Sequence, residues 1–239
     1  MNNLFVYAHR GASAEAPENT LAAFRRALDA GADGIEMDVH LASDGVPVVI
    51  HDDTLERTTD GTGAVAALRA SQLQSLDAGS WFGPHFAGEP LPTLEEALRL
   101  LAGRLRINLE IKEARAGLAV LDLLRVFPAA DVVISSFDHA LLAALRRTAP
   151  DLPLAVLQEA GNWRRALARA AALRACAFHP RVNLVSRPLL AACRRMQLPV
   201  FTWTVDDVGQ ARALVRAGVA GVFSNDPAGL REHFPAAVA

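Results

Sequence analysis

The chain has 239 residues, of which 51% are hydrophobic and 21% charged, so it can bury a large core and belongs to no disordered or fibrous class. Its formal net charge of −2 at pH 7 lacks the lysine and arginine excess with which proteins bind nucleic acids or anionic membranes. No apolar stretch approaches the roughly 20 residues of a membrane span, and we expect a cytoplasmic protein with neither a nucleic-acid partner nor a stable membrane association.

Eight short apolar runs predict eight β-strands. In chain order they are LFVYA at 4–8, GIEMDVHL at 34–41, RINLEIK at 106–112, VVISSF at 132–137, PLAVLQ at 153–158, ACAFHP at 175–180, PVFTWTV at 199–205 and AGVFSND at 220–226. Between them lie segments with the period of an amphipathic helix, at residues 20–31, 93–103, 139–150, 163–175, 186–196 and 207–218. Several of these segments end in glycine or proline, which commonly stop a helix.

The alternation of strand and helix predicts a TIM (β/α)8 barrel, because a right-handed βα repeat of eight units closes in this way over about 250 residues. A doubly wound open sheet is the alternative, since strand order cannot be read from the sequence. The second and third runs begin at 34 and 106, which leaves a gap of 72 residues. We therefore expect one domain over residues 1–239, with a small inserted subdomain at about 46–91 packed over one face.

The two cysteines, Cys176 and Cys193, fall in a predicted strand and a predicted helix. Their spacing is not that of a CxxC motif, so neither a disulfide framework nor a zinc site is indicated. We expect both to be reduced thiols in the core, where cysteine packs as a small hydrophobic residue.

Polar residues stand where several predicted strands end. The first run is followed by His9-Arg10-Gly11, the second contains Glu36 and Asp38, the third contains Glu110 and Lys112, and the strand-like run VPVVIHD of the insert ends at His51-Asp52. The active site of a TIM barrel lies at the carboxyl ends of its strands. Because side chains alternate along a strand, Glu36 and Asp38 are expected together at the barrel mouth, with the aliphatic residues between them facing the helices.

Three carboxylates, those of Glu36, Asp38 and Glu110, are thus expected to converge. Such a cluster is costly to bury without positive charge, and a hard divalent cation with oxygen ligands, Mg²⁺ or Ca²⁺, would supply it. The type of ligand does not separate the two ions. The alternative is an ion network without metal, in which Arg10 and Lys112 balance the carboxylates.

Two histidines, His9 and His51, are expected at the same rim. An imidazole with an ordinary pKa near 6.5 can act as acid or base at neutral pH, so a pair can divide the two roles. Arg10 and Lys112 are suited to hold a phosphate. A metal, two histidines and two cationic side chains together indicate phosphoryl-ester chemistry.

Other polar residues have weaker predictions. Gly11 is expected to let the backbone turn tightly, and Glu18-Asn19-Thr20 to start the first helix. Asp52 and Asp53 either orient His51 or cap a turn, and the turn is favoured because Asp prefers such places. The residues expected either to line the pocket or to be structural are His40, Ser135, Ser136 and Asn225. The residues expected on the surface or in loops are His85, His139, His179 and His233.

Longer segments of the chain follow one another in the order of a known family. They are AHRGASAEAPENTLAAF from residue 8, GADGIEMDVHLASDGVPVVIHDDTLERTTDGTG from 31, LDAGSWF from 76, PTLEEAL from 92, INLEIK from 107 and FTWTVDD from 201. These motifs resemble the glycerophosphodiester phosphodiesterase family. The resemblance runs from His9 to about Pro227, and no key position in the motifs is substituted.

The resemblance implies a TIM-barrel hydrolase that cleaves small-molecule glycerophosphodiesters to sn-glycerol 3-phosphate and an alcohol, within lipid and glycerol metabolism. It implies His9 and His51 as the acid/base pair, and Glu36, Asp38 and Glu110 as ligands of the cation. Arg10 would contact the phosphate, Lys112 would line the same site, and Trp203 would line the side of the site that holds the glycerol. The attacking group would be either a neighbouring glycerol hydroxyl, through a cyclic phosphate, or water.

Two other functions stay open at the level of sequence. A related barrel could act on lysophospholipids or phosphatidylinositol, although the chain lacks an obvious basic amphipathic helix for a membrane surface. A non-catalytic barrel could bind a phosphorylated ligand or a protein. The preferred head group and the oligomeric state are not indicated by any feature of the sequence.

Overall fold

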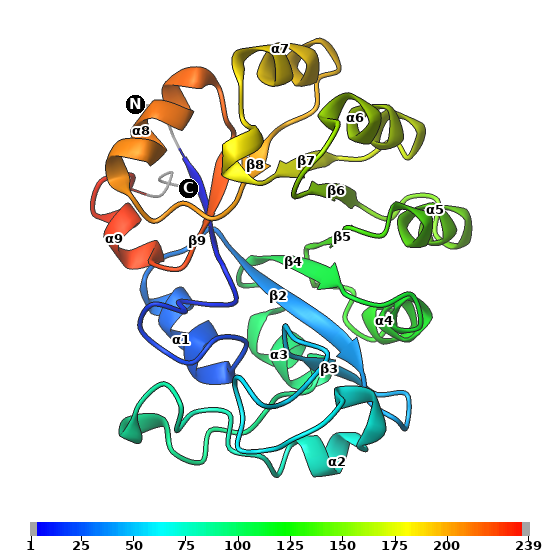
Figure 1. Ribbon diagram of the computed structural model, residues 1–239, viewed down its shortest axis with the longest axis vertical. Coiled ribbons are helices and arrows are strands. Elements are labelled where there is room, and N and C mark those ends of the chain that lie inside the picture. The colour runs from blue at the N-terminus through cyan, green and yellow to red at the C-terminus, as the bar shows by residue number, and fades with distance from the viewer. Residues whose placement is uncertain (1–3, 236–239) are drawn as a thin grey trace.

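Eight parallel strands form a barrel with helices around it in the computed structural model, which describes residues 4–235 (Figure 1). The strands are β1 (Phe5–Ala8), β2 (Gly34–Leu41), β4 (Arg106–Ile111), β5 (Val132–Ser136), β6 (Leu154–Gln158), β7 (Ala177–Pro180), β8 (Phe201–Thr202) and β9 (Gly221–Ser224). Their order in the sheet is β7-β6-β5-β4-β2-β1-β9-β8. The outermost ends of the predicted domain, residues 1–3 and 236–239, lie outside the described residues.

The ring closes between β7 and β8. Phe178 and Val200 form a parallel bridge there, and the N–H of Phe178 donates to the carbonyl of Pro199 at 2.9 Å. The predicted TIM barrel and its eight strands are confirmed, and the open sheet is wrong as an alternative. The sequence could not decide this point, because closure depends on which strands become neighbours.

Helices cover the outside of the ring in Figure 1, mostly one after each strand. The described helices are α1 (Leu21–Asp29), α2 (Ala70–Leu73), α3 (Leu94–Leu101), α4 (Ala116–Leu124), α5 (His139–Thr148), α6 (Trp163–Ala172), α7 (Arg187–Arg195), α8 (Val208–Ala217) and α9 (Pro227–Arg231). The expected helical segments correspond to α1, α3 and α5 to α8. The helix α4 was not among them, because AGLAVLDLL is apolar on most sides and shows little helical period.

Side-chain caps fix where the loops at the carboxyl edge end and the helices begin. Thr20 accepts a hydrogen bond from the N–H of Ala23 at 3.2 Å, and Asp138 accepts two from the first turn of α5. Thr93 and Glu96 form a capping box at the start of α3. These caps anchor the loops that precede α1, α3 and α5.

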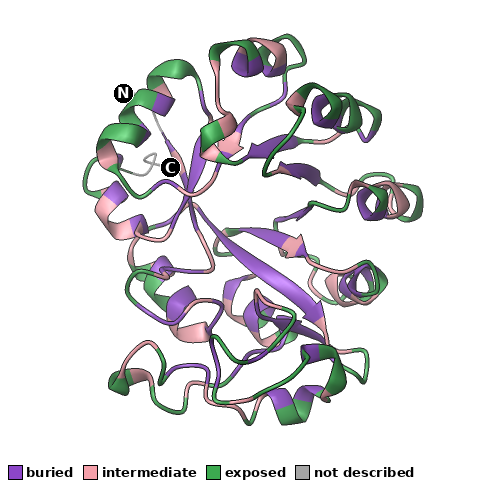
Figure 2. Cartoon of the chain, in the orientation of Figure 1, coloured by how far each residue is buried: buried purple, intermediate pink, exposed green. Residues whose placement is uncertain are grey.

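The apolar core lies between the strands and the helices, and Figure 2 shows buried strands with exposed outer helix faces. On β2, Ile35, Met37 and Val39 belong to this core, as the alternation of side chains predicts. A second layer fills the barrel below its mouth, where the ring of Tyr7 stacks on that of Phe223 at 4.8 Å. Gly34 is required beside it, because a Cβ at that position would lie 2.5 Å from the Tyr7 ring.

His179 belongs to this inner layer. It is 1% exposed and packs against Phe201 and Phe223, so its expected place on the surface is wrong. The reason is its position on β7, where its side chain points into the barrel and not toward a loop.

The segment between β2 and α3 has its own apolar cluster. It begins with β3 (Pro47–Val49), which pairs antiparallel with β2, and continues through short helical turns and α2. Its buried residues, which include Ile50, Leu55, Leu73 and Leu91, form a cluster separate from the main core. In Figure 1 this segment extends beyond α1 and α3 at the lower end of the view.

The two cysteines differ from each other. Cys193 is free and buried in α7, as predicted, whereas Cys176 is free but exposed. The prediction for Cys176 is wrong because β7 begins only at Ala177, so the thiol lies just before the strand.

Within residues 4–235, none of the helices has both the length and the apolar character that crossing a bilayer requires.

Candidate active site

The carboxyl ends of the strands surround a cavity of about 470 Å³. Seven of the eight predicted site residues line it, namely His9, Arg10, Glu36, His51, Glu110, Lys112 and Trp203. The eighth, Asp38, is 1% exposed and lies behind them, in contact with Arg10 and Lys112. The predicted residues are therefore brought together, although they come from positions 9 to 203 of the chain.

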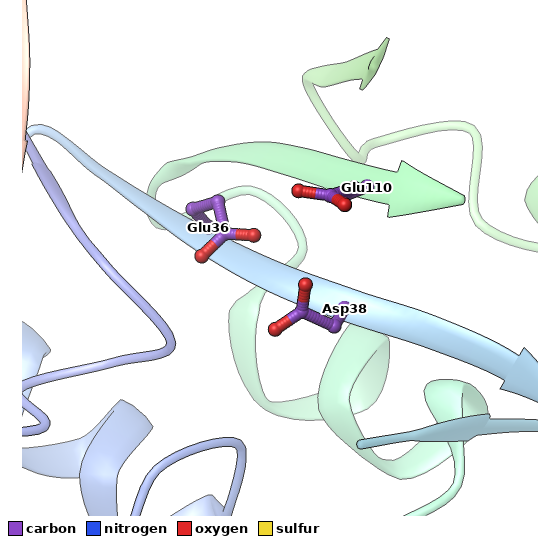
Figure 3. Close-up of side chains that lie close together, drawn as sticks. All are labelled: Glu36, Asp38 and Glu110. Atoms are coloured by element: carbon purple, nitrogen blue, oxygen red, sulfur yellow. The ribbon is translucent and has the colours of Figure 1, made fainter. Parts of the chain in front are cut away.

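The three predicted carboxylates point toward one another from two neighbouring strands (Figure 3). The register of β2 and β4 sets Asp38 opposite Glu110, with Glu36 two residues earlier on the same face of β2. One oxygen of each carboxylate lies within 4.8 Å of an oxygen of the others. Side-chain alternation and parallel pairing thus create the cluster directly.

Two cationic side chains reach this cluster. Lys112 Nζ lies 2.6 Å from an oxygen of Glu110 and 3.3 Å from an oxygen of Asp38. Arg10 Nε lies 3.4 Å from Asp38, while its Nη1 binds Glu18 at 2.8 Å. Although burial alone would raise it, the charges of Lys112 and Arg10 hold the pKa of Asp38 well below its usual value.

The other two carboxylates have raised pKa values, although Lys112 pairs with Glu110. Glu36 accepts a hydrogen bond from the backbone N–H of Arg10 at 2.9 Å, but it forms no ion pair within the described residues. Burial, followed by the charges of Asp38 and Glu110, raises the pKa of Glu36 well above its usual value. Burial and the charge of Asp38 raise the pKa of Glu110 to about 7.

The donor set therefore fits a divalent cation. It consists of hard oxygen ligands that converge, and burial and mutual repulsion raise the pKa values of two of the three carboxyl groups. An ion network made only of Arg10 and Lys112 leaves Glu36 without a partner, which argues against the alternative without metal. Mg²⁺ and Ca²⁺ both accept such ligands.

His9 follows β1 and is half-buried. Its Nδ1 lies 2.8 Å from Oδ1 of Asn225, which follows β9. Burial, followed by the positive charge of Arg10, lowers the pKa of His9 to about 4, so the imidazole is neutral at pH 7. The sequence offered Asn225 only as one of several residues near a strand end, and the structure gives it a specific contact.

His51 follows β3, in the segment between β2 and α3. Its Nδ1 lies 2.5 Å from Oδ1 of Asp52, so the prediction that Asp52 caps a turn is wrong and the alternative, that it orients His51, is correct. Local turn preference failed here because the neighbouring imidazole is the better partner. Asp53 is exposed and its side chain makes no hydrogen bond within residues 4–235.

Arg57 links the two loops that carry the histidines. Its guanidinium binds Asp52 through Nε at 2.6 Å and Glu18 through two nitrogens, each at 2.9 Å. Since Glu18 also binds Arg10, a continuous chain of ion pairs runs from His51 to Arg10. Arg57 lies within the motif that begins at residue 31, but the sequence assigned it no role, because its partners are 5 and 39 residues away.

The loop after β1 is tightly built. Gly11 has a φ of +84°, and a Cβ there would lie 2.7 Å from Ala23, which agrees with the predicted tight turn. Thr20 caps α1 as predicted. Glu18 and Asn19 also make contacts that the sequence did not indicate, since Asn19 Nδ2 donates to Asp38 at 2.8 Å and Glu18 binds both arginines.

One wall of the cavity is apolar. The ring of Trp203 meets that of Phe137 edge to face at 5.7 Å, and the indole N–H donates to the carbonyl of His179 at 3.0 Å. Leu157 and Phe223 also line this side. The cavity therefore has one wall of charged groups and one of aromatic and aliphatic groups, as a ligand with an anionic centre and a carbon skeleton requires.

The remaining polar candidates lie below the cavity or away from it. Ser135 accepts a hydrogen bond from Asn108 at 2.9 Å, and Ser136 donates to the carbonyl of Ile111. His40 is buried, with Nε2 3.1 Å from the carbonyl of His51, so it has a structural role. Asn108, which the sequence did not single out, lines the cavity, and its Oδ1 is buried without a hydrogen-bond partner in the described residues.

Known proteins resemble this chain over nearly its whole length. Residues 9–229 match the model of the Glycerophosphoryl diester phosphodiesterase family. A glycerophosphodiester phosphodiesterase of Caldanaerobacter subterraneus subsp. tengcongensis is 38% identical over 232 residues, which cover 93% of this chain and 94% of that protein.

Solved structures agree in fold. A phosphodiesterase of Oleispira antarctica, in complex with the product sn-glycerol-3-phosphate, superimposes with a TM-score of 0.90 at 31% identity and covers 96% of both chains. A glycerophosphodiester phosphodiesterase of Agrobacterium tumefaciens superimposes with a TM-score of 0.83 at 32% identity, over 96% of this chain and 99% of that one.

Proposed function

The chain belongs to the glycerophosphoryl diester phosphodiesterase family, and we propose that it cleaves glycerophosphodiesters with a divalent cation and two histidines. The products would be sn-glycerol 3-phosphate and an alcohol. One observation carries the proposal: two histidines, three carboxylates and two cationic side chains surround one cavity. The product-bound relative from Oleispira antarctica, which shares the fold and 31% of the sequence, supports the same product for this chain. We also propose that residues 46–91 are an insert of this single catalytic domain.

Glu36, Asp38 and Glu110 would hold the cation, and the proposal covers Mg²⁺ and Ca²⁺ alike. When bound, the ion would draw negative charge from the phosphate oxygens and so favour attack on phosphorus. Lys112 and Arg10, beside the three carboxylates, would bind the phosphate oxygens. Arginine suits this role because its N–H groups match the geometry of a phosphate.

His9 is proposed as the general base. It is neutral at pH 7 because its pKa is lowered to about 4, and its Nδ1 is engaged by Asn225. Nε2 is then the nitrogen that can take a proton from the attacking hydroxyl.

His51 is proposed as the general acid. A positive charge on its ring would be balanced by the carboxylate of Asp52, 2.5 Å from Nδ1, and Nε2 would deliver a proton to the leaving alkoxide. The two histidines would thus divide proton removal and proton delivery because one has a neutral partner and the other an anionic one.

Trp203 and Phe137 would pack against the carbon skeleton of the glycerol, since they form the apolar wall opposite the charged groups. The attacking hydroxyl would come either from the glycerol itself, through a cyclic phosphate that water then opens, or from water. Detection of a cyclic glycerophosphate would support the first route, and incorporation of solvent oxygen with no cyclic species at any time would support the second.

The proposal is tested by incubating the protein with glycerophosphocholine, glycerophosphoethanolamine and lysophosphatidylcholine and measuring glycerol 3-phosphate. The account predicts release from the first two. Faster turnover of lysophosphatidylcholine would assign the site to lysophospholipids instead. His9→Ala and His51→Ala should each lower turnover by about 10²-fold, the usual contribution of acid/base catalysis, and normal turnover in both would exclude the two-histidine mechanism.

A further inference from the structure

A network behind His9 reaches two residues at the far end of the chain. His9 and Asn225 lie on neighbouring loops because β1 and β9 are adjacent, with Ala8 opposite Ser224. The N–H of His9 donates to the carbonyl of Ser224 at 2.8 Å, which fixes the backbone at this point. The side chains of His9 and Asn225 therefore meet although 216 residues separate them.

The orientation of the Asn225 amide is set by Asp206, which follows β8. Asn225 Nδ2 lies 2.9 Å from one oxygen of Asp206, and its backbone N–H lies 2.7 Å from the other. The hydroxyl of Ser224 donates to Asp206 at 2.9 Å as well. An ionised carboxylate only accepts hydrogen bonds, so the NH₂ group of Asn225 has to face Asp206 and its Oδ1 has to face His9.

This orientation determines which nitrogen of His9 carries the proton. Oδ1 of Asn225 lies 2.8 Å from Nδ1 of His9 and 3.0 Å from the hydroxyl of Ser13, whose single hydrogen also reaches the carbonyl of His9 at 2.9 Å. Because an amide oxygen is an acceptor only, Nδ1 has to be the protonated nitrogen of the neutral ring. Nε2, which makes no hydrogen bond within residues 4–235, is then the acceptor of a ring that lines the cavity.

We infer that Asp206 and Asn225 are positioning residues, which hold His9 in the tautomer with Nδ1 protonated and Nε2 ready to accept a proton. This inference rests on the proposed role of His9 as general base. It goes beyond it by assigning a function to two residues that contact neither the cavity nor the three carboxylates in the described residues.

The charged groups around His9 agree with a neutral ring. Burial is the main cause of the lowered pKa of His9, followed by the charge of Arg10, which also disfavours an imidazolium. The carboxylates of Asp38 and Glu18 each oppose this effect less strongly. The formal charge of Asp206 is separated from His9 by the amide of Asn225, so the pair positions the ring without placing an anion against it.

Asp206→Asn is the first test. The new amide would set an NH₂ group against the NH₂ group of Asn225, and rotation of the Asn225 amide would then turn its NH₂ toward His9. His9 would change to the other tautomer, in which Nε2 carries the proton and cannot act as a base. We expect kcat to fall by about 10²-fold, with KM nearly unchanged because no substrate contact is lost.

The double variant Asp206→Asn/Asn225→Asp is the second test. The exchange keeps each hydrogen bond, because the amide at 206 donates to the carboxylate at 225 and that carboxylate accepts from His9 Nδ1. We expect kcat to return to within about 10-fold of the wild type. The anion now beside His9 favours the imidazolium, so the acidic limb of the kcat/KM profile should move to higher pH.

Asp207→Asn is the matched control, since Asp207 is the next residue and caps α8 by accepting from the N–H of Gln210. It should leave kcat and the pH profile unchanged, because Asn is an equally good cap. A loss of activity in this control similar to that in Asp206→Asn would overturn the inference, since it would show a general disturbance of the loop.

The ¹⁵N shifts of the His9 ring give a readout that does not depend on turnover. His9→Gln identifies the signal, and the wild type and the double variant should show a protonated Nδ1, whereas Asp206→Asn should show a protonated Nε2. Unchanged kcat and an unchanged tautomer in Asp206→Asn would overturn the inference while leaving the proposed function intact. A wild type without activity on any glycerophosphodiester would overturn the proposed function alone, since the tautomer is still observed.

Discussion

Asp52 holds Nδ1 of His51 at 2.5 Å, whereas the corresponding nitrogen of His9 meets the neutral amide of Asn225 at 2.8 Å. The two histidines of the site are thus engaged through the same ring nitrogen by partners of different charge. This difference is the physical basis for assigning the acid to His51 and the base to His9.

Replacing Asp52 by asparagine should test that difference. The amide oxygen can still accept from Nδ1, but the charge that balances an imidazolium at His51 is lost, so we expect turnover to fall by about 10- to 10²-fold. The measurement is kcat on glycerophosphocholine at neutral pH. Asp53→Asn is the control, because Asp53 is the exposed neighbour, and equal effects of the two substitutions would contradict the role of Asp52.

Replacing Glu36 by glutamine should separate stability from activity. Glu36 is 4% exposed beside two other carboxylates, and its pKa is raised well above the usual value. A neutral glutamine avoids the cost of burying or protonating this carboxyl group, so it should raise the thermal midpoint of the cation-free protein by a few degrees, on the order of 1 kcal/mol. The same variant should lose most of the stabilisation that Mg²⁺ or Ca²⁺ gives the wild type. Thermal unfolding with and without each ion measures both effects, and a lower midpoint without ion would contradict the account.

The buried His179 should make the protein sensitive to acid. Burial lowers the pKa of His179 to about 3, which means that the unfolded chain binds the proton more tightly than the folded one. Stability is therefore complete above about pH 6.5 and falls as the pH decreases toward about 3, by at most about 1.4 kcal/mol per pH unit from this group.

His179→Leu removes this titration without removing a side-chain hydrogen bond, because the His179 ring makes none within residues 4–235 and its Nδ1 is buried without a partner there. The free energy of unfolding of the variant should change less with pH between 6.5 and 3 than that of the wild type. His85→Leu, at an exposed position, is the control, and its free energy of unfolding should change with pH as that of the wild type does. Identical slopes for His179→Leu and the wild type would show that the buried imidazole does not contribute.

The parts of the site that the sequence predicted depend on local geometry. Alternation along one strand is enough to place Glu36 and Asp38 on the same face, and the parallel repeat brings Glu110 beside them. The eight strands were found for the same reason, because each apolar run is a local signal.

The parts that the sequence missed depend on contacts between distant residues. Asn225 meets His9 across 216 residues and Arg57 meets Glu18 across 39, and neither pair carries a local pattern. Asp52 was misjudged because the preference of Asp for turns was given more weight than the imidazole of the adjacent His51, with which its side chain pairs. His179 was misjudged because it lies in a predicted strand, yet the partners that bury it, Phe201 and Phe223, come from other strands.

The central claim is that this barrel hydrolyses glycerophosphodiesters with the help of a cation held by Glu36, Asp38 and Glu110. The most direct measurement is a ³¹P NMR time course of glycerophosphocholine with the wild-type protein, first after treatment with EDTA and then after addition of Mg²⁺ or Ca²⁺. The account predicts no conversion after chelation, and formation of glycerol 3-phosphate once an ion is restored. Undiminished conversion in EDTA, or no conversion with either ion, would contradict it.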